Sequence, residues 1–183
     1  MTAKPRSRLC AHLVLAVLST CGLAAMAWAS FAMPSAHVVY NPSNSVPVGW
    51  YRIESVTSPA DSLHVGSIVL ARLPAEAAAL AAQRGYLPPH IPLLKRIGAV
   101  APQDVCIVNG VVRIDGVPVA AVLRTDRMGR PLLSWQQCRA LAEGELFLLS
   151  VTNPASFDSR YFGPIAASAV IGTAQSVYLE KQP

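Results

Sequence analysis

Two serines close together in the first third of this 183-residue sequence are the side chains best suited to attack a carbonyl carbon. Ser43 and Ser45 lie in a short stretch in which Pro42 and Pro47 restrict the backbone dihedral angle φ and favour an extended chain. A hydroxyl held on such a segment loses little freedom when it attacks a bound substrate. Proline, serine and asparagine are also the usual composition of an ordinary loop, so this stretch needs support from elsewhere in the chain.

A serine nucleophile needs a base, and the histidines are poor candidates for that role. One lies in an apolar segment, one directly after it, one in a loop before a predicted strand and one in a proline-rich connector; they are His12, His37, His64 and His90. Histidine, cysteine and acidic residues also show no spacing typical of metal ligands, so we expect neither a metal nor another cofactor.

Lysine is the other candidate base, and only Lys95 and Lys181 follow the apolar segment. Lys95 lies between apolar residues on a predicted strand, Leu93–Val100. A lysine can accept a proton only when it is neutral, and burial or the adjacent cation Arg96 would lower its pKa. The alternative is a residue at the edge of a sheet whose amine stays in water.

A third polar cluster, Ser156-Phe-Asp158-Ser-Arg160, runs directly into two aromatic residues. Its hydroxyl and carboxylate groups are suited to orient an amine or a guanidinium. The alternative is a turn that contains only a structural Asp–Arg pair.

An apolar run over residues 9–33 is long enough to span a bilayer and follows three basic residues. Basic residues on this side predict a cytoplasmic N-terminus and an exported remainder, in the periplasm if the cell is bacterial. Residues 1–33 therefore form a membrane anchor or signal sequence, and residues 34–183 one exported domain. The length of the run favours a retained anchor, whereas Ala27-Trp-Ala29 resembles a signal-peptidase site and favours cleavage.

Charge and cysteine content fit an exported domain. The formal net charge of +5 falls to about +2 after residue 33, and no basic stripe with interleaved aromatic residues suggests binding to nucleic acid. Cys106 and Cys138 lie in the exported part, where an oxidising compartment favours a disulfide between them. Two separate buried thiols are the alternative.

Strand and turn patterns dominate the exported part. Asn109-Gly110 and Asp115-Gly116 bracket a short apolar segment and predict a β-hairpin. Helix propensity is high only over 74–84, which ends at a glycine suited to cap a helix, and over 132–142, where a short helix would carry Cys138. The other predicted strands cover residues 50–56, 66–72, 93–100, 105–108, 145–151 and 169–179. We therefore predict a mainly β domain with a helical insertion.

Taken together, the three polar stretches resemble the Ser–Lys signal peptidase superfamily, and within it the TraF-type peptidases that process conjugative pilins. The serine box of signal peptidases, Pro-Ser-x-Ser-Met, is matched by residues 42–45, with Val46 in place of Met, and the lysine box, Lys-Arg-Val/Ile, by residues 95–97. The last box, Ser-x-Asp-Ser-Arg-Tyr-aromatic-Gly, is matched throughout residues 156–163. Three boxes in order, after an apolar segment, extend the resemblance over nearly the whole chain.

The resemblance implies a signal-peptidase-like antiparallel β fold and a role for each matched residue. Ser45 would be the nucleophile and Lys95 the general base, while the Ser43 hydroxyl would bind the oxyanion. Ser156 would orient the Lys95 amine. Asp158, paired with Arg160, would hold that support in place.

The implied function is membrane-associated cleavage of a pilin precursor or another exported pre-protein, with or without joining of the cut end into a ring. Membrane lipid is the other expected partner. A general signal peptidase that removes leader peptides is one alternative, and a non-catalytic component of a secretion system is another.

Overall fold

The computed structural model describes residues 5–32, 37–56 and 63–180. Backbone contacts divide the chain into two compact units, Met1–Ala36 and His37–Pro183.

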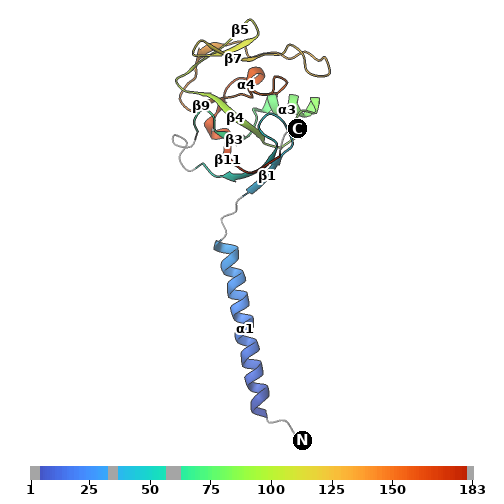
Figure 1. Cartoon of the computed structure of the whole chain (residues 1–183), viewed down its shortest axis with the longest axis vertical. Helices are drawn as coiled ribbons and strands as arrows, with labels where there is room; N and C mark the ends of the chain where they lie inside the picture. The colour runs from blue at the N-terminus through green and yellow to red at the C-terminus, as the bar shows by residue number, and fades with distance from the viewer. Residues whose placement is uncertain (1–4, 33–36, 57–62, 181–183) are drawn as a thin grey trace. The chain divides into compact units, whose positions relative to one another are not determined.

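The first unit contains one long helix, α1 (Pro5–Ala32; Figure 1). Within it, Cys10–Trp28 has a mean hydropathy of 1.9 and is long and apolar enough to cross a membrane, by length and composition. Both cysteines of this stretch, Cys10 and Cys21, are free thiols. The helix is consistent with membrane association.

The second unit is built from antiparallel strands, and the predicted mainly β fold class is confirmed. Its strands are β1 (His37–Asn41), β2 (Gly49–Glu54), β3 (Ile68–Ala71), β4 (Leu93–Val100), β5 (Asp104–Val108), β6 (Val111–Ile114), β7 (Val117–Ala121), β8 (Cys138–Ala140), β9 (Glu145–Leu148), β10 (Ile165–Ala166) and β11 (Val170–Leu179). One sheet has the order β1-β2-β11-β3-β4-β9-β10, and the other β7-β6-β5-β8. In Figure 1, β5 and β7 lie at the opposite end of this unit from β1.

The predicted β-hairpin is present on both sides of β6. Asn109 and Gly110 have φ angles of 52° and 74°, and Asp115 and Gly116 have φ angles of 51° and 78°. Two successive residues with positive φ form the tight turn whose twist matches that of paired strands, and Asn-Gly and Asp-Gly tolerate this conformation best. Local turn chemistry therefore sets the β5–β6–β7 meander.

The helical insertion predicted over 74–84 is α3 (Ala75–Arg84). It ends at Gly85, whose φ of 71° lets its N–H bond back to the carbonyls of Ala81 and Ala82. Ala77 and Ala81 form the buried face of the helix. The helix therefore packs on the domain through small apolar side chains.

The helix predicted over 132–142 is wrong, because this segment contains the strand β8 and no helical residue. Asp104 to Cys106 of β5 pair with β8, and this pairing sets Cys106 directly opposite Cys138. The predicted disulfide between these two cysteines is confirmed. Pairing with β5 and the covalent bridge both require an extended chain here, so tertiary contacts override helix propensity.

Strand β4 is the element around which the second unit packs. It contributes Leu94, Ile97 and Ala99 to three separate apolar clusters of buried residues. A short helix, α4 (Ser159–Phe162), follows β9 and begins directly after Asp158. Because β4 is held from several directions, any side chain on it has a well-defined position.

Candidate active site

The two serines lie in the loop that joins β1 to β2, and this loop is closed by pairing of Asn41 with Gly49. Gly49 has a φ of 149°, and a Cβ there would lie 2.2 Å from the Tyr178 carbonyl oxygen, so only glycine fits. Ser45 is buried, with 8% of its surface exposed, whereas Ser43 is exposed. The loop therefore presents one hydroxyl at its surface and one at its buried side.

Asn41 organises this loop and was not singled out in the sequence. Its side-chain amide donates to the carbonyls of Ser43 (2.7 Å), Val46 (3.2 Å) and Pro47 (3.1 Å). Its side-chain oxygen accepts hydrogen bonds from the Ser43 backbone N–H and hydroxyl. Asparagine commonly bonds to the backbone two residues further on, and this signal could have identified it.

The Ser43 and Ser45 hydroxyl oxygens lie 2.8 Å apart. A hydroxyl has one hydrogen, and that of Ser43 is donated to the Asn41 side-chain oxygen at 2.9 Å. The Ser45 hydroxyl must therefore be the donor in the pair. In this state the Ser45 hydrogen points towards Ser43.

Lys95 is in the interior of β4, where only 2% of its surface is exposed. Its amine donates to the Ser156 hydroxyl at 2.6 Å. Within the part of the chain that the structure describes, no carboxylate accepts a hydrogen bond from this amine. The alternative of an edge lysine with its amine in water is therefore wrong.

The environment of Lys95 lowers its pKa from 10.5 to about 8. Burial is the largest cause, because it penalises the charged amine. The negative charge of Asp158 opposes this change, and the positive charge of Arg160 adds to it. Arg96, expected to act as the neighbouring cation, instead donates a hydrogen bond to the Gly66 carbonyl.

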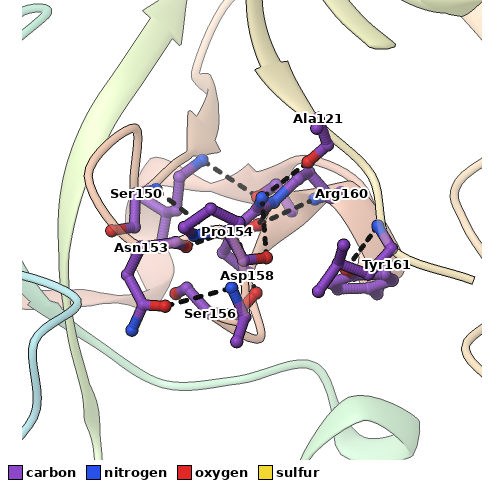
Figure 2. Close-up of polar contacts among 12 residues, drawn as sticks. Ala121, Ser150, Asn153, Pro154, Ser156, Asp158, Arg160 and Tyr161 are labelled. Atoms are coloured by element: carbon purple, nitrogen blue, oxygen red, sulfur yellow. Dashed lines mark hydrogen bonds and ion pairs between the residues drawn. The ribbon is translucent and has the colours of Figure 1, made fainter. Parts of the chain in front are cut away.

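Asp158 and Arg160 form an ion pair with no exposed side-chain surface (Figure 2). Two guanidinium N–H groups reach the two carboxylate oxygens, at 2.7 and 2.9 Å. Others donate to the carbonyls of Ala121, Pro154, Asn153 and Ser156. A buried ion pair is tolerated when its remaining donors are satisfied in this way.

The ion pair fixes the segment that carries Ser156. Arg160 binds the Ser156 carbonyl at 3.1 Å, and the Asp158 carboxylate accepts the backbone N–H of Ser150 at 3.0 Å. The backbone that carries the Ser156 hydroxyl is therefore fixed, and this hydroxyl accepts a hydrogen bond from the Lys95 amine. A rigid acceptor on one side of an amine restricts where the rest of that amine can point.

A cavity of about 280 Å³ adjoins Ser45. Its walls come from the serine loop, from β4 and from the segment that follows β9: residues 44–47, Arg96 and residues 149–152. No hydrogen bond joins the Ser45 hydroxyl to the Lys95 amine, although both residues lie in the described part of the chain. The structure thus forms three contacts, Ser43–Ser45, Lys95–Ser156 and Asp158–Arg160, and leaves the serine and lysine pairs separate.

Known proteins resemble this chain over most of its length. Conjugal transfer protein TraF of Agrobacterium fabrum (strain C58 / ATCC 33970) is 37% identical over 147 residues, which are 75% of this chain and 80% of that protein. Plasmid transfer protein TraF of Escherichia coli is 31% identical over 174 residues, 89% of this chain and 91% of that protein. A signal peptidase I structure from Enterococcus faecalis V583 has 19% identity and a TM-score of 0.38, covering 61% of this chain and 95% of that one.

The family model described as signal peptidase, peptidase S26, matches residues 10–179, which include all three polar stretches. This match extends from the apolar helix to the end of β11. The chain therefore belongs to the signal peptidase family of serine peptidases, peptidase S26.

Proposed function

We propose that this chain is a membrane-associated endopeptidase that cleaves a pilin precursor for conjugative transfer, with Ser45 as nucleophile and Lys95 as general base. The observation that carries the proposal is the state of Lys95. This lysine is buried, bonds to a neutral hydroxyl, and has a pKa lowered to about 8. A base with a pKa near the ambient pH combines a useful neutral fraction with enough basicity to take a proton.

Catalysis begins when Lys95 Nζ removes the hydroxyl proton of Ser45 and the serine oxygen bonds to the substrate carbonyl carbon. The Ser43 hydroxyl and the Ser45 backbone N–H stabilise the resulting oxyanion. Collapse breaks the peptide bond, and the leaving amine takes the proton from the Lys95 ammonium. Water or an amine then attacks the acyl-enzyme, which gives either a free end or a joined one.

Two hydroxyl rotations are required before this chemistry can start. Ser45 donates to Ser43 in the free protein, and Ser43 donates to Asn41. Substrate binding must turn the Ser45 hydrogen towards Lys95 and the Ser43 hydrogen towards the oxyanion. Hydrogen bonds of a catalytic site are often completed only when substrate is bound.

The pilin substrate is proposed because both relatives described above are named as conjugal or plasmid transfer proteins. A retained anchor over 1–33 would attach a catalytic domain over 34–183 to the inner membrane, with that domain in the periplasm and membrane lipid as its partner. A cleaved signal sequence over the same residues would direct the export of that domain only. The apolar helix supports this arrangement. The reaction uses side chains of this chain alone and needs no cofactor.

The test is processing of a pilin precursor by membranes that contain the full-length chain or its folded variants. Ser45→Ala, Lys95→Ala and Lys95→Arg should each lower turnover by at least about a thousandfold, since a guanidinium cannot accept the proton and neither partner acts alone. The exposed-histidine variants His64→Ala and His90→Ala are the matched controls and should retain turnover. Robust turnover by Lys95→Arg would contradict the mechanism. Preferential cleavage of unrelated exported precursors would instead identify a general signal peptidase.

A further inference from the structure

Ser150 carries a buried hydroxyl that the mechanism above does not use. Only 2% of the residue surface is exposed, and its side-chain oxygen has no hydrogen-bond partner. Among the described residues it is the one buried side-chain nitrogen or oxygen atom in that condition. Buried hydroxyls are nearly always paired, so an unpaired one in a native protein calls for a physical explanation.

The backbone around Ser150 is held in place from two sides. The Leu149 N–H donates to the Arg96 carbonyl at 2.9 Å, which continues the pairing of this segment with β4. The N–H of Ser150 itself donates to the Asp158 carboxylate at 3.0 Å, as Figure 2 shows. The backbone that carries the hydroxyl is therefore fixed, in part by the same ion pair that holds Ser156.

Ser150 lines the cavity that adjoins Ser45. At about 280 Å³ this cavity is slightly smaller than most ligand pockets, so it suits a peptide group with small side chains. Its walls also include Val46, Pro47 and Leu149, which provide apolar contacts. A hydroxyl both donates and accepts hydrogen bonds, as a peptide group does through its N–H and C=O.

We propose that the Ser150 hydroxyl is a substrate-binding group, which hydrogen-bonds to the backbone of the pre-protein next to the bond that Ser45 attacks. The inference rests on the proposed function, because it takes an extended peptide as the occupant of the cavity. It accounts for a hydroxyl that is buried, fixed and unpaired in the free enzyme. The partner it lacks is supplied by the substrate.

The test separates binding from folding by measuring both on full-length protein. Affinity for a short fluorescent peptide with Ala on both sides of its central bond is compared between Ser45→Ala and Ser45→Ala/Ser150→Ala chains, neither of which can turn over. Loss of one hydrogen bond should weaken binding about three- to tenfold. The melting temperature of the Ser150→Ala chain without peptide should be unchanged or higher, because an unpaired buried hydroxyl has been removed. Ser168→Ala, at an exposed serine, is the control and should change neither quantity.

Unchanged peptide affinity in the double variant would overturn the inference. Weaker binding accompanied by a lower melting temperature would also overturn it, because that combination indicates a structural hydroxyl. Full processing of a precursor by Ser45→Ala would defeat the proposed function instead. The peptide-binding comparison would still decide the role of Ser150 in that case.

Discussion

Two buried basic side chains in the second unit, Lys95 on β4 and Arg160 on α4, have opposite surroundings. Arg160 has no exposed side-chain surface, and its guanidinium donates hydrogen bonds to a carboxylate and to four carbonyl oxygens. Lys95 is almost as deeply buried, yet the one hydrogen bond described for its amine goes to a neutral hydroxyl. A cation with a full set of acceptors stays charged and serves as scaffold, whereas a cation with few acceptors is neutral more easily and can serve as a base.

The ion pair of Arg160 also acts on the pKa of Lys95. Arg160 contributes positive charge that lowers the pKa of Lys95, while Asp158 contributes negative charge that raises it. Because the two charges of the ion pair act in opposite directions, their effects on the pKa of Lys95 oppose each other, and burial is the largest single cause. The pair can therefore position Ser156 without determining the charge of the amine.

Breaking the ion pair should have the largest effect on stability. Arg160→Met leaves the Asp158 carboxylate buried without its cation and should lower the free energy of unfolding by roughly 3–5 kcal/mol. Arg52→Met is the matched control, because Arg52 pairs with Glu54 where both side chains are about half exposed. It should change the free energy of unfolding by no more than about 0.5 kcal/mol. Denaturant unfolding of both variants measures the difference, and equal losses would contradict the contrast.

Removing Lys95, the other buried cation, should instead raise the free energy of unfolding. The folded pKa of Lys95 is about 8 and the unfolded one near 10.5, so the unfolded chain binds the extra proton between these values. The free energy of unfolding contributed by this group therefore rises with pH across that window, and below pH 8 the full cost of the charged amine is present. Lys95→Met should stabilise the protein at pH 7 by roughly 3 kcal/mol, the free energy that corresponds to the difference between these two pKa values.

The same variant should also remove the rise in stability between pH 8 and pH 10.5. Urea unfolding at several pH values gives both quantities. A Lys95→Met chain that is less stable than the wild type at pH 7 would mean that this lysine is a structural cation like Arg160.

The smallest effect should come from Ser156, whose hydroxyl accepts a hydrogen bond from Lys95. Ser156→Ala removes the hydroxyl that binds the amine at 2.6 Å. The fold should persist, but the amine is less well oriented, so we expect kcat/KM to fall about ten- to a hundredfold. The pKa of Lys95 should also fall further, because an acceptor of the charged form is lost. Ser176→Ala, at an exposed serine on β11, is the control for precursor processing, and equal losses in both variants would remove Ser156 from this role.

Parts of the fold that depend on local chemistry could be predicted from the sequence. The turns at Asn109 and Asp115 follow from residues that tolerate positive φ, and the end of α3 follows from Gly85. Strand β4 begins and ends at the predicted residues, because its apolar residues and its flanking turn signals agree. The local sequence is therefore sufficient to specify these elements.

Parts that depend on contacts between distant residues could not be predicted. The segment containing β8 has the propensity of a helix, and only its partner strand β5 makes it extended. Arg96 is adjacent to Lys95 in sequence, yet the cation that acts on the amine is Arg160 from another element. The unpaired state of Ser150 is likewise visible only when every neighbour is in place.

The pH dependence of precursor processing is the most direct test that a neutral Lys95 activates Ser45. The neutral fraction of a base with a pKa of about 8 rises tenfold per pH unit below that value and then levels off. We predict that kcat/KM of the full-length chain follows this curve, with an apparent pKa of about 8. A curve that levels off near the usual value of histidine, about 6.5, or that still rises towards the usual value of free lysine, about 10.4, would contradict the account.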